Sequence, residues 1–180
     1  MRVFITGASS GIGAALAAHY AARGARLGLV ARRAETLAEV GRKLPGSPAC
    51  YLADVADARA MQDAARDFMA RFGVPDIVIA NAGVSVGTLT EHAEDIAVFG
   101  SVLQTNVVGL AATFHPFVAP MRAAGRGRLA GIASVAGVRG IPGAGAYSAS
   151  KAAAIAYLEA LRVELRPSGV RVVTVCPGYV

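Results

Sequence analysis

The sequence predicts an α/β fold, a doubly wound parallel sheet with helices on both faces, which makes three layers. The first observation behind this prediction is that short apolar segments alternate with helical segments along the whole chain. The second is that most of the short segments are continuously apolar, as is typical of parallel strands covered on both faces. The third is that glycine or polar residues follow these segments, at the carboxyl ends of strands where such sheets bind ligands.

The expected strands are short apolar runs that end at a turn or at a polar residue. They cover residues 2–6, 26–31, 49–53, 76–80, 128–133 and 170–176. The expected helices have apolar residues at helical spacing and end near glycine or proline. They cover residues 11–23, 34–44, 57–72, a long stretch that follows a loop at 83–93 and runs to about 124, and 146–166. A length of 180 residues without an internal linker predicts one domain over residues 1–180.

The composition, with 54% hydrophobic and 17% charged residues, is typical of a protein with a well-filled core. Cys50 and Cys176 follow no metal or redox spacing, so we expect them to be ordinary core residues of a reduced compartment, the cytoplasm. The three histidines are scattered along the chain, and no metal site is expected.

The chain is basic, with a net charge of +6 and a pI near 9.9. Its arginines are spread along the sequence without the block that tracks nucleic acid, so a phosphorylated small molecule fits the charge better. Residues 96–121 contain no charged side chain, which raises the question of a membrane span. Because this run contains Gln104, Asn106, Pro116 and Pro120, we expect a helix buried in protein and no span.

A glycine-rich segment, Gly7-Ala-Ser-Ser-Gly11-Ile-Gly13, separates the first expected strand from the first helix. Small residues let the backbone approach a pyrophosphate, and a helix N-terminus offers amide donors and a positive dipole. The segment could also be no more than a tight turn, but its position between strand and helix favours phosphate binding. The candidate cofactor contacts here are Gly7, Ser9, Ser10, Gly11, Ile12 and Gly13.

Arg32 and Arg33 follow the second expected strand, about 20 residues after the glycine-rich segment. An acidic residue at this place binds the ribose 2′-hydroxyl of NAD, and an arginine accepts the 2′-phosphate of NADP. The sequence reads Val-Ala-Arg-Arg with no acid, so NADP(H) is the preferred cofactor and NAD(H) stays possible. In the alternative reading, one or both arginines only begin a helix in solvent.

Tyr147 and Lys151 lie four residues apart in the last expected helix and so share one face. A nearby cation favours a phenolate, which makes such a pair a candidate general acid/base. Lys151 is one of two lysines beside sixteen arginines, and Ser134 ends the fifth expected strand. A lone tyrosine–lysine pair is more often an exposed feature of an alanine-rich helix, so the rest of the chain decides between the readings.

Together these segments resemble the short-chain dehydrogenase/reductase family, in order and in spacing, over essentially the whole chain. The motifs that carry the resemblance are Thr6-Gly-x-x-x-Gly-Ile-Gly13, Asn81-Ala-Gly83, Asn106, Ser134, Tyr147-x-x-x-Lys151 and Pro177-Gly178. The resemblance implies a one-domain Rossmann fold and an oxidoreductase that transfers a hydride between NADP(H) and a carbonyl or alcohol substrate.

The resemblance also implies roles for individual residues. Tyr147 would exchange the proton, Lys151 would assist it and hold the nicotinamide ribose, Ser134 would bind the substrate oxygen, and Asn106 would hold a water relay to Lys151. Other cofactor contacts implied in this way are Asp54 and Val55 at the adenine, Asn81, Ala82 and Gly83 at the ribose, and Pro177, Gly178 and the backbone of Val180 at the nicotinamide. The segment Asn81–Gly83 is equally compatible with a turn that merely ends a strand.

Family members continue beyond the Pro-Gly pair into a loop and helix over the substrate and then a final strand. We therefore expect these parts to be missing from this chain. A non-catalytic nucleotide-binding module, or an inactive fragment of such an enzyme, is the alternative function. The resemblance further implies a homodimer or homotetramer that pairs through the helices around 101–124 and 146–166, although their apolar residues could instead all be core.

Overall fold

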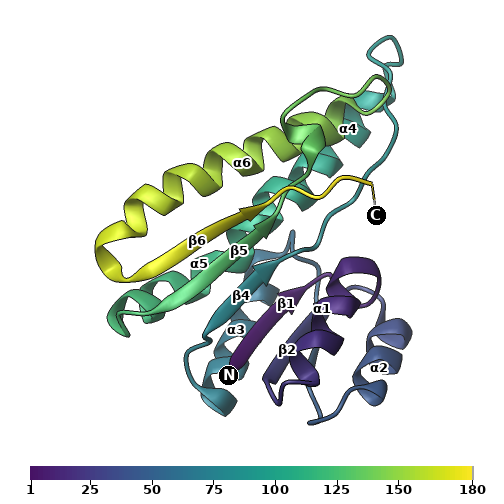
Figure 1. Ribbon diagram of the computed structural model, residues 1–180. Coiled ribbons are helices and arrows are strands. Elements are labelled where there is room, and N and C mark those ends of the chain that lie inside the picture. The colour runs from purple at the N-terminus through teal and green to yellow at the C-terminus, as the bar shows by residue number, and fades with distance from the viewer. Residues whose placement is uncertain (180) are drawn as a thin grey trace.

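The computed structural model describes residues 1–179, so the expected contact of Val180 lies outside the described residues. Within them, one parallel sheet has the strand order β3–β2–β1–β4–β5–β6 (Figure 1). The strands are β1 (Arg2–Thr6), β2 (Arg26–Ala31), β3 (Ala49–Leu52), β4 (Ile77–Ala80), β5 (Gly127–Ile132) and β6 (Val170–Val175). The predicted doubly wound parallel sheet is confirmed. The order reverses between β1 and β4, which is where open α/β sheets form a ligand crevice.

Helices connect the strands and begin and end within one or two residues of the expected positions. They are α1 (Gly11–Ala21), α2 (Ala34–Lys43), α3 (Ala58–Phe72), α4 (Asp95–Leu103), α5 (Gly109–Ala123) and α6 (Gly145–Leu165). Short turns η2 (Val135–Gly137) and η3 (Arg166–Ser168) lie on either side of α6. Asp57 begins α3 as an N-cap, because its carboxylate accepts hydrogen bonds from the backbone of Arg59 and Ala60.

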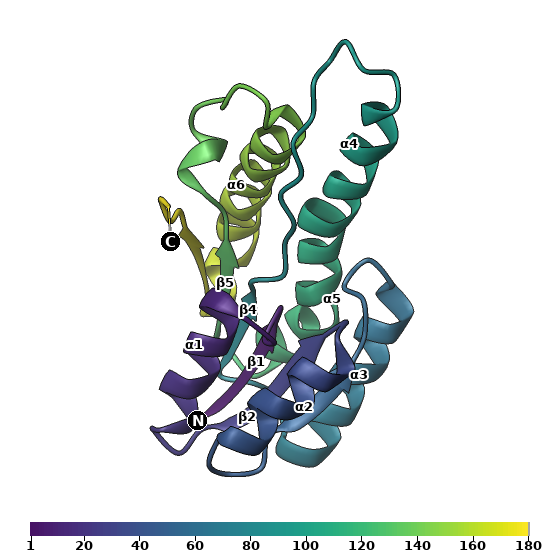
Figure 2. The same cartoon turned by 90° about the vertical axis from the view of Figure 1, so that its right-hand side faces the viewer.

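Side-chain alternation along the strands divides the core into two parts, one on each face of the sheet. On one face Phe4 packs with Phe68 of α3 and Phe117 of α5, and α6 adds Leu158. On the other face the neighbouring residue Val3 belongs to the core that α1 and α2 cover. These are the three layers that the apolar strands predict (Figure 2).

The two cysteines correct one expectation, because both are exposed rather than buried in the core. Cys50 lies on β3 and Cys176 follows β6, the strands at the two edges of the sheet. Edge strands have a neighbour on one side only, so their side chains are covered less completely. Val173 and Val175 of β6 are likewise 37% and 39% exposed.

The uncharged stretch 96–121 lies in a helical segment from Asp95 to Ala123, which contains an unexpected π-helical turn, η1 (Gln104–Val108), between α4 and α5. By length and composition alone this stretch could cross a membrane, as core helices of other proteins could. The expectation of a helix buried in protein holds for one side only. Phe114, Phe117 and Met121 are buried. In the 18-residue apolar part of this helix that is long enough to span a membrane, however, 28% of the residues are buried.

Candidate active site

Two adjoining cavities lie along the carboxyl ends of the strands. The first, about 450 Å³, extends from the loop after β1 to the loop after β3, and the second, about 390 Å³, lies over the ends of β5 and β6. Both are lined by Ile12, Asn81, Gly83 and Val84. The cavities therefore form one continuous cleft at the switch point of the sheet.

The glycine-rich loop between β1 and α1 is shaped by two close approaches. A Cβ atom at Gly7, whose φ is +67°, would come within 2.8 Å of the Ala82 backbone. Gly13 packs so closely against the Gly7 carbonyl that a Cβ there would overlap it. Gly11, with φ +51°, faces open space at the start of α1. An open glycine beside free helix amides fits the pyrophosphate of a dinucleotide.

Asn81 and Thr6 fix this loop to the end of β4. The Asn81 side-chain amide donates to the carbonyls of Thr6 and Gly7 at 3.0 and 3.2 Å. The buried Thr6 hydroxyl accepts from the backbone N–H groups of Asn81 and Ala82. The Asn81–Gly83 turn therefore holds the glycine-rich loop in place, while Ala82 and Gly83 also line the first cavity.

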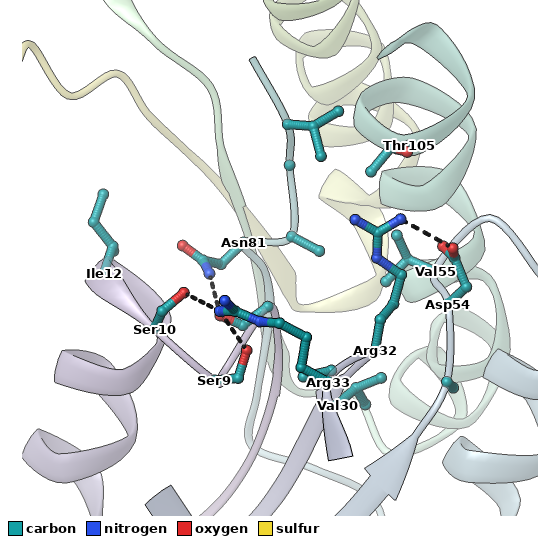
Figure 3. A pocket seen from close by; sticks show the side chains of 16 residues that line it. Ser9, Ser10, Ile12, Val30, Arg32, Arg33, Asp54, Val55, Asn81 and Thr105 are labelled. Atoms are coloured by element: carbon teal, nitrogen blue, oxygen red, sulfur yellow. Dashed lines mark hydrogen bonds and ion pairs between the residues drawn. The ribbon is translucent and has the colours of Figure 1, made fainter. Parts of the chain in front are cut away.

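Two arginines reach into the first cavity in different ways (Figure 3). The guanidinium of Arg33 donates to the hydroxyls of Ser9 and Ser10 at 3.3 and 2.9 Å. Arg32 points to the opposite side and pairs with Asp54 at 3.4 Å, and both partners are well exposed. Arg32 can be recruited by a phosphate because an exposed ion pair such as that with Asp54 is weak. Arg33 can be recruited because its bonds are to neutral hydroxyls, which leave its charge unpaired by them. Val55 lies beside Asp54 in the same wall.

The second cavity brings together Ser134, Tyr147 and Lys151. Ser134 is nearly buried at the end of β5, and its Oγ accepts the backbone N–H of Ala136 at 3.1 Å. That bond leaves the hydroxyl proton free to be donated. The Lys151 ammonium lies 5.6 Å from the centre of the Tyr147 ring, as expected for neighbours one helical turn apart.

Lys151 is a buried cation. Its side chain is 5% exposed, and Nζ donates to the carbonyl of Ile132 at 2.8 Å. Burial lowers the pKa of the Lys151 ammonium from 10.5 to about 8, opposed in part by nearby Cys176. The group is therefore still largely protonated at neutral pH, but it loses its proton more readily than an exposed lysine.

Asn106 lies behind the cleft, in the π-helical turn η1. Its side chain accepts from the Val84 N–H at 2.8 Å and donates to the Val84 carbonyl and to the Ser150 hydroxyl, both at 2.9 Å. A Cβ at Gly83 would come within 3.2 Å of Asn106 Oδ1 and 3.4 Å of Lys151 Nζ. Asn106 thus lies next to Lys151 across a glycine, and π-helical turns are frequent at functional sites.

Most of the residues proposed from the sequence meet in this cleft, including Pro177 and Gly178. Gly11, Gly13 and Asn106 shape it from outside the lining. Ser150, which was not predicted from the sequence, is fully buried and donates to the Tyr147 carbonyl at 2.6 Å. Its position three residues after Tyr147 and directly before Lys151 was the available signal. Thr105, which lines the first cavity, had no such signal.

Comparison with known proteins gives a consistent result. The sequence profile of the short chain dehydrogenase family matches residues 1–180. The chain is 39% identical over 183 residues to 11-beta-hydroxysteroid dehydrogenase A of Sesamum indicum, covering 99% of this chain and 52% of that protein. Thus it spans about half the length of this curated relative.

Two of the similar solved structures contain a bound nicotinamide nucleotide or an analogue of one. An alcohol dehydrogenase from the archaeon Thermococcus sibiricus, complexed with 5-hydroxy-NADP, superposes with a TM-score of 0.90 at 30% identity and covers 99% of this chain and 76% of that one. A short chain dehydrogenase/reductase from Burkholderia phymatum, in complex with NAD, superposes with a TM-score of 0.92 at 30% identity. The match covers 99% of this chain and 66% of that one.

Proposed function

The chain belongs to the short-chain dehydrogenase family, and from that premise we propose that it is an oxidoreductase acting on a carbonyl or alcohol with NADP(H) as cofactor. The observation that carries the proposal is the meeting of Ser134, Tyr147 and Lys151 in a cavity that adjoins the glycine-rich loop. This arrangement offers a proton donor, a hydrogen-bond donor and a cation at one place, next to a site for a dinucleotide.

NADP(H), when bound, supplies or accepts the hydride. In the reducing direction the Tyr147 hydroxyl gives its proton to the substrate oxygen. The Ser134 hydroxyl donates a hydrogen bond to the same oxygen while negative charge develops on it. The Lys151 ammonium, 5.6 Å from the Tyr147 ring, stabilises the phenolate that the proton transfer leaves. Asn106 holds the Val84 segment against the cleft and would keep a water path to Lys151 in place.

Lys151 is the only charged side chain in the described lining of the second cavity, and its ammonium is bonded to the Ile132 carbonyl next to Tyr147. No second charged side chain there would pair with a charged substrate, so the lining favours an uncharged one. The direct test is the oxidation of NADPH by the purified protein with a panel of aldehydes, ketones and quinones, followed at 340 nm. Turnover with any member supports the oxidoreductase. Cofactor binding without turnover across the panel would instead favour the non-catalytic nucleotide-binding module.

The preference for NADP(H) rests on Arg32 and Arg33, which line the first cavity where the second strand ends. Replacing both with glutamine is expected to raise the Kd for NADPH about 10- to 100-fold, because one or two charge-assisted hydrogen bonds to the 2′-phosphate would be lost. The Kd for NADH should stay nearly constant, because NADH has no 2′-phosphate. Titration followed by cofactor fluorescence measures both, with Arg42→Gln at the far end of α2 as the matched control. Equal loss of both affinities would contradict the assignment.

Self-association through α4, α5 and α6 completes the proposal. Five apolar residues of α5 and α6 lie in the chain's own core: Leu110, Phe114, Phe117, Leu158 and Leu161. Others on these helices remain exposed, among them Ile96 at 70% and Val163 at 72%. We expect a dimer or tetramer by sedimentation velocity, and Ile96→Glu should shift it toward monomer. A monomer in the unmodified protein would contradict this expectation.

A further inference from the structure

The excess positive charge of the protein gathers at the amino ends of the strands, opposite the candidate active site. Six arginines from separate parts of the chain line two hollows there: Arg2, Arg26, Arg71, Arg126, Arg128 and Arg171. In Figure 1 the amino ends of the strands lie on the side of the sheet where the N-terminus is labelled. Along the sequence the arginines are dispersed, which favoured the cofactor as the partner for the positive charge. In the folded chain six of them lie together at the amino ends of the strands, on the opposite side from the cleft.

The two hollows share one carboxylate. The first, about 560 Å³, is lined by Arg2, Arg26 and Arg71, and the second, about 360 Å³, by Arg126, Arg128 and Arg171. Asp76 lies at the border of both and is the only acidic residue in the described lining of either. Six arginines therefore face one carboxylate at the amino ends of the strands, which leaves an excess of positive charge there.

Asp76 orients the arginine beside it. Its carboxylate accepts from the Arg2 backbone N–H at 2.8 Å and from Arg2 Nη2 at 2.8 Å, and it accepts from Arg126 at 2.6 Å. These bonds hold the pKa of Asp76 well below its usual range. The remaining Arg2 Nη1 lies against Gly73, where a Cβ would come within 2.9 Å. Arg2 is thus held in a fixed orientation at the wall of the first hollow.

The other two arginines of the first hollow retain capacity to bind an anion. Arg26 is exposed and has no ion pair among the described residues. It lies directly beside Arg2 in the sheet register, so both side chains project from the same face about 5 Å apart at the backbone. Arg71 packs over the Phe72 ring at 5.2 Å, and its ion pair among the described residues is a 3.5 Å contact with Asp67, whose carboxylate also accepts from Tyr51.

We propose that the hollow formed by Arg2, Arg26 and Arg71 binds a small molecule that carries two or more phosphate groups. Guanidinium groups from β1, β2 and α3 line a concave space. That of Arg2 is bonded to Asp76, whereas those of Arg26 and Arg71 can each pair with a phosphate group through two parallel hydrogen bonds. A ligand with two or more phosphate groups can offer one phosphate to Arg26 and another to Arg71. The concave shape also favours a small ligand over a flat anionic membrane, which would contact only the rim.

Isothermal titration of the protein with sodium tripolyphosphate tests this proposal. The Arg32→Gln/Arg33→Gln protein serves as the background, so that the cleft at the opposite edge does not contribute. We expect one site per chain, weakened about tenfold or more by Arg26→Gln. Arg26→Lys should restore the affinity only in part, because lysine lacks the planar fork. The matched control, Arg59→Gln at the other end of α3, should bind as the background does.

Several results would overturn the proposal. These are no binding at millimolar tripolyphosphate, binding that Arg26→Gln leaves unchanged, or equal weakening by Arg26→Gln and Arg59→Gln, which would indicate general charge attraction. Co-sedimentation with vesicles of phosphatidylglycerol in the absence of tripolyphosphate binding would point to a membrane contact and also overturn it. Thermal unfolding of each variant shows whether it is folded, and Arg71→Gln provides a second test of the same hollow.

Discussion

Replacement of Tyr147 by phenylalanine is expected to lower kcat about 10²- to 10⁴-fold, the usual contribution of a positioned general acid. The Tyr147 phenol lines the second cavity together with Ser134 and the Lys151 ammonium, which lies 5.6 Å from the centre of its ring. Phenylalanine keeps the ring and its packing on α6 but has no hydroxyl. Binding of NADPH should therefore change by less than about threefold, a difference of well under 1 kcal/mol.

The measurement needs turnover and cofactor affinity on the same preparations. NADPH oxidation gives kcat and KM, and fluorescence titration gives Kd. Tyr157→Phe is the matched control, because Tyr157 lies on the same helix but packs against the hydrophobic core away from the cleft. Unchanged kcat in Tyr147→Phe would remove this residue as the acid. An equal loss of kcat in Tyr157→Phe would mean that any tyrosine-to-phenylalanine change on α6 lowers the rate, and the loss in Tyr147→Phe would then not identify the acid.

The parts of the site that the sequence predicted are those set by local spacing. Tyr147 and Lys151 share a face because four residues make about one helical turn, and Gly7 to Gly13 form a loop because strand and helix lie on either side. The sheet followed from the alternation of apolar segments. These patterns involve residues that are close together in the chain, so they can be recognised from the sequence without the structure.

The features that the sequence analysis missed depend on contacts between distant segments. The π-helical turn forms where Asn106 bonds Val84 and Ser150, which lie 22 and 44 residues away. The exposure of Cys50 depends on β3 being an edge strand, which the strand order decides. The arginines at the amino edge come from residues 2 to 171, and their clustering exists only in the folded chain.

Lys151→Met is expected to remove a pH dependence of stability as well as most of the activity. In the folded protein burial lowers the pKa of Lys151 from 10.5 to about 8. Between these two values the unfolded chain binds more protons than the native chain, so the free energy of unfolding rises with pH across this window. The full rise contributed by this group is about 3 kcal/mol, at about 1.4 kcal/mol per pKa unit.

Methionine has a similar length but no charge, so the Lys151→Met protein should lack this rise and be at least as stable as the unmodified protein at pH 7. Urea unfolding at pH 7, 8, 9 and 10 measures the difference between the two curves. Lys43→Met is the control, since Lys43 is the other lysine and is exposed beside Glu39. Parallel curves for all three proteins would contradict a buried, perturbed Lys151.

The same substitution should lower kcat about 100-fold, because the phenolate of Tyr147 would form without a cation beside it. Activity and stability would then change in opposite directions. A charge that costs stability where it lies, yet is required for turnover, is retained for chemistry and not for folding. A variant that lost both stability and activity would instead assign Lys151 a structural role through its bond to the Ile132 carbonyl.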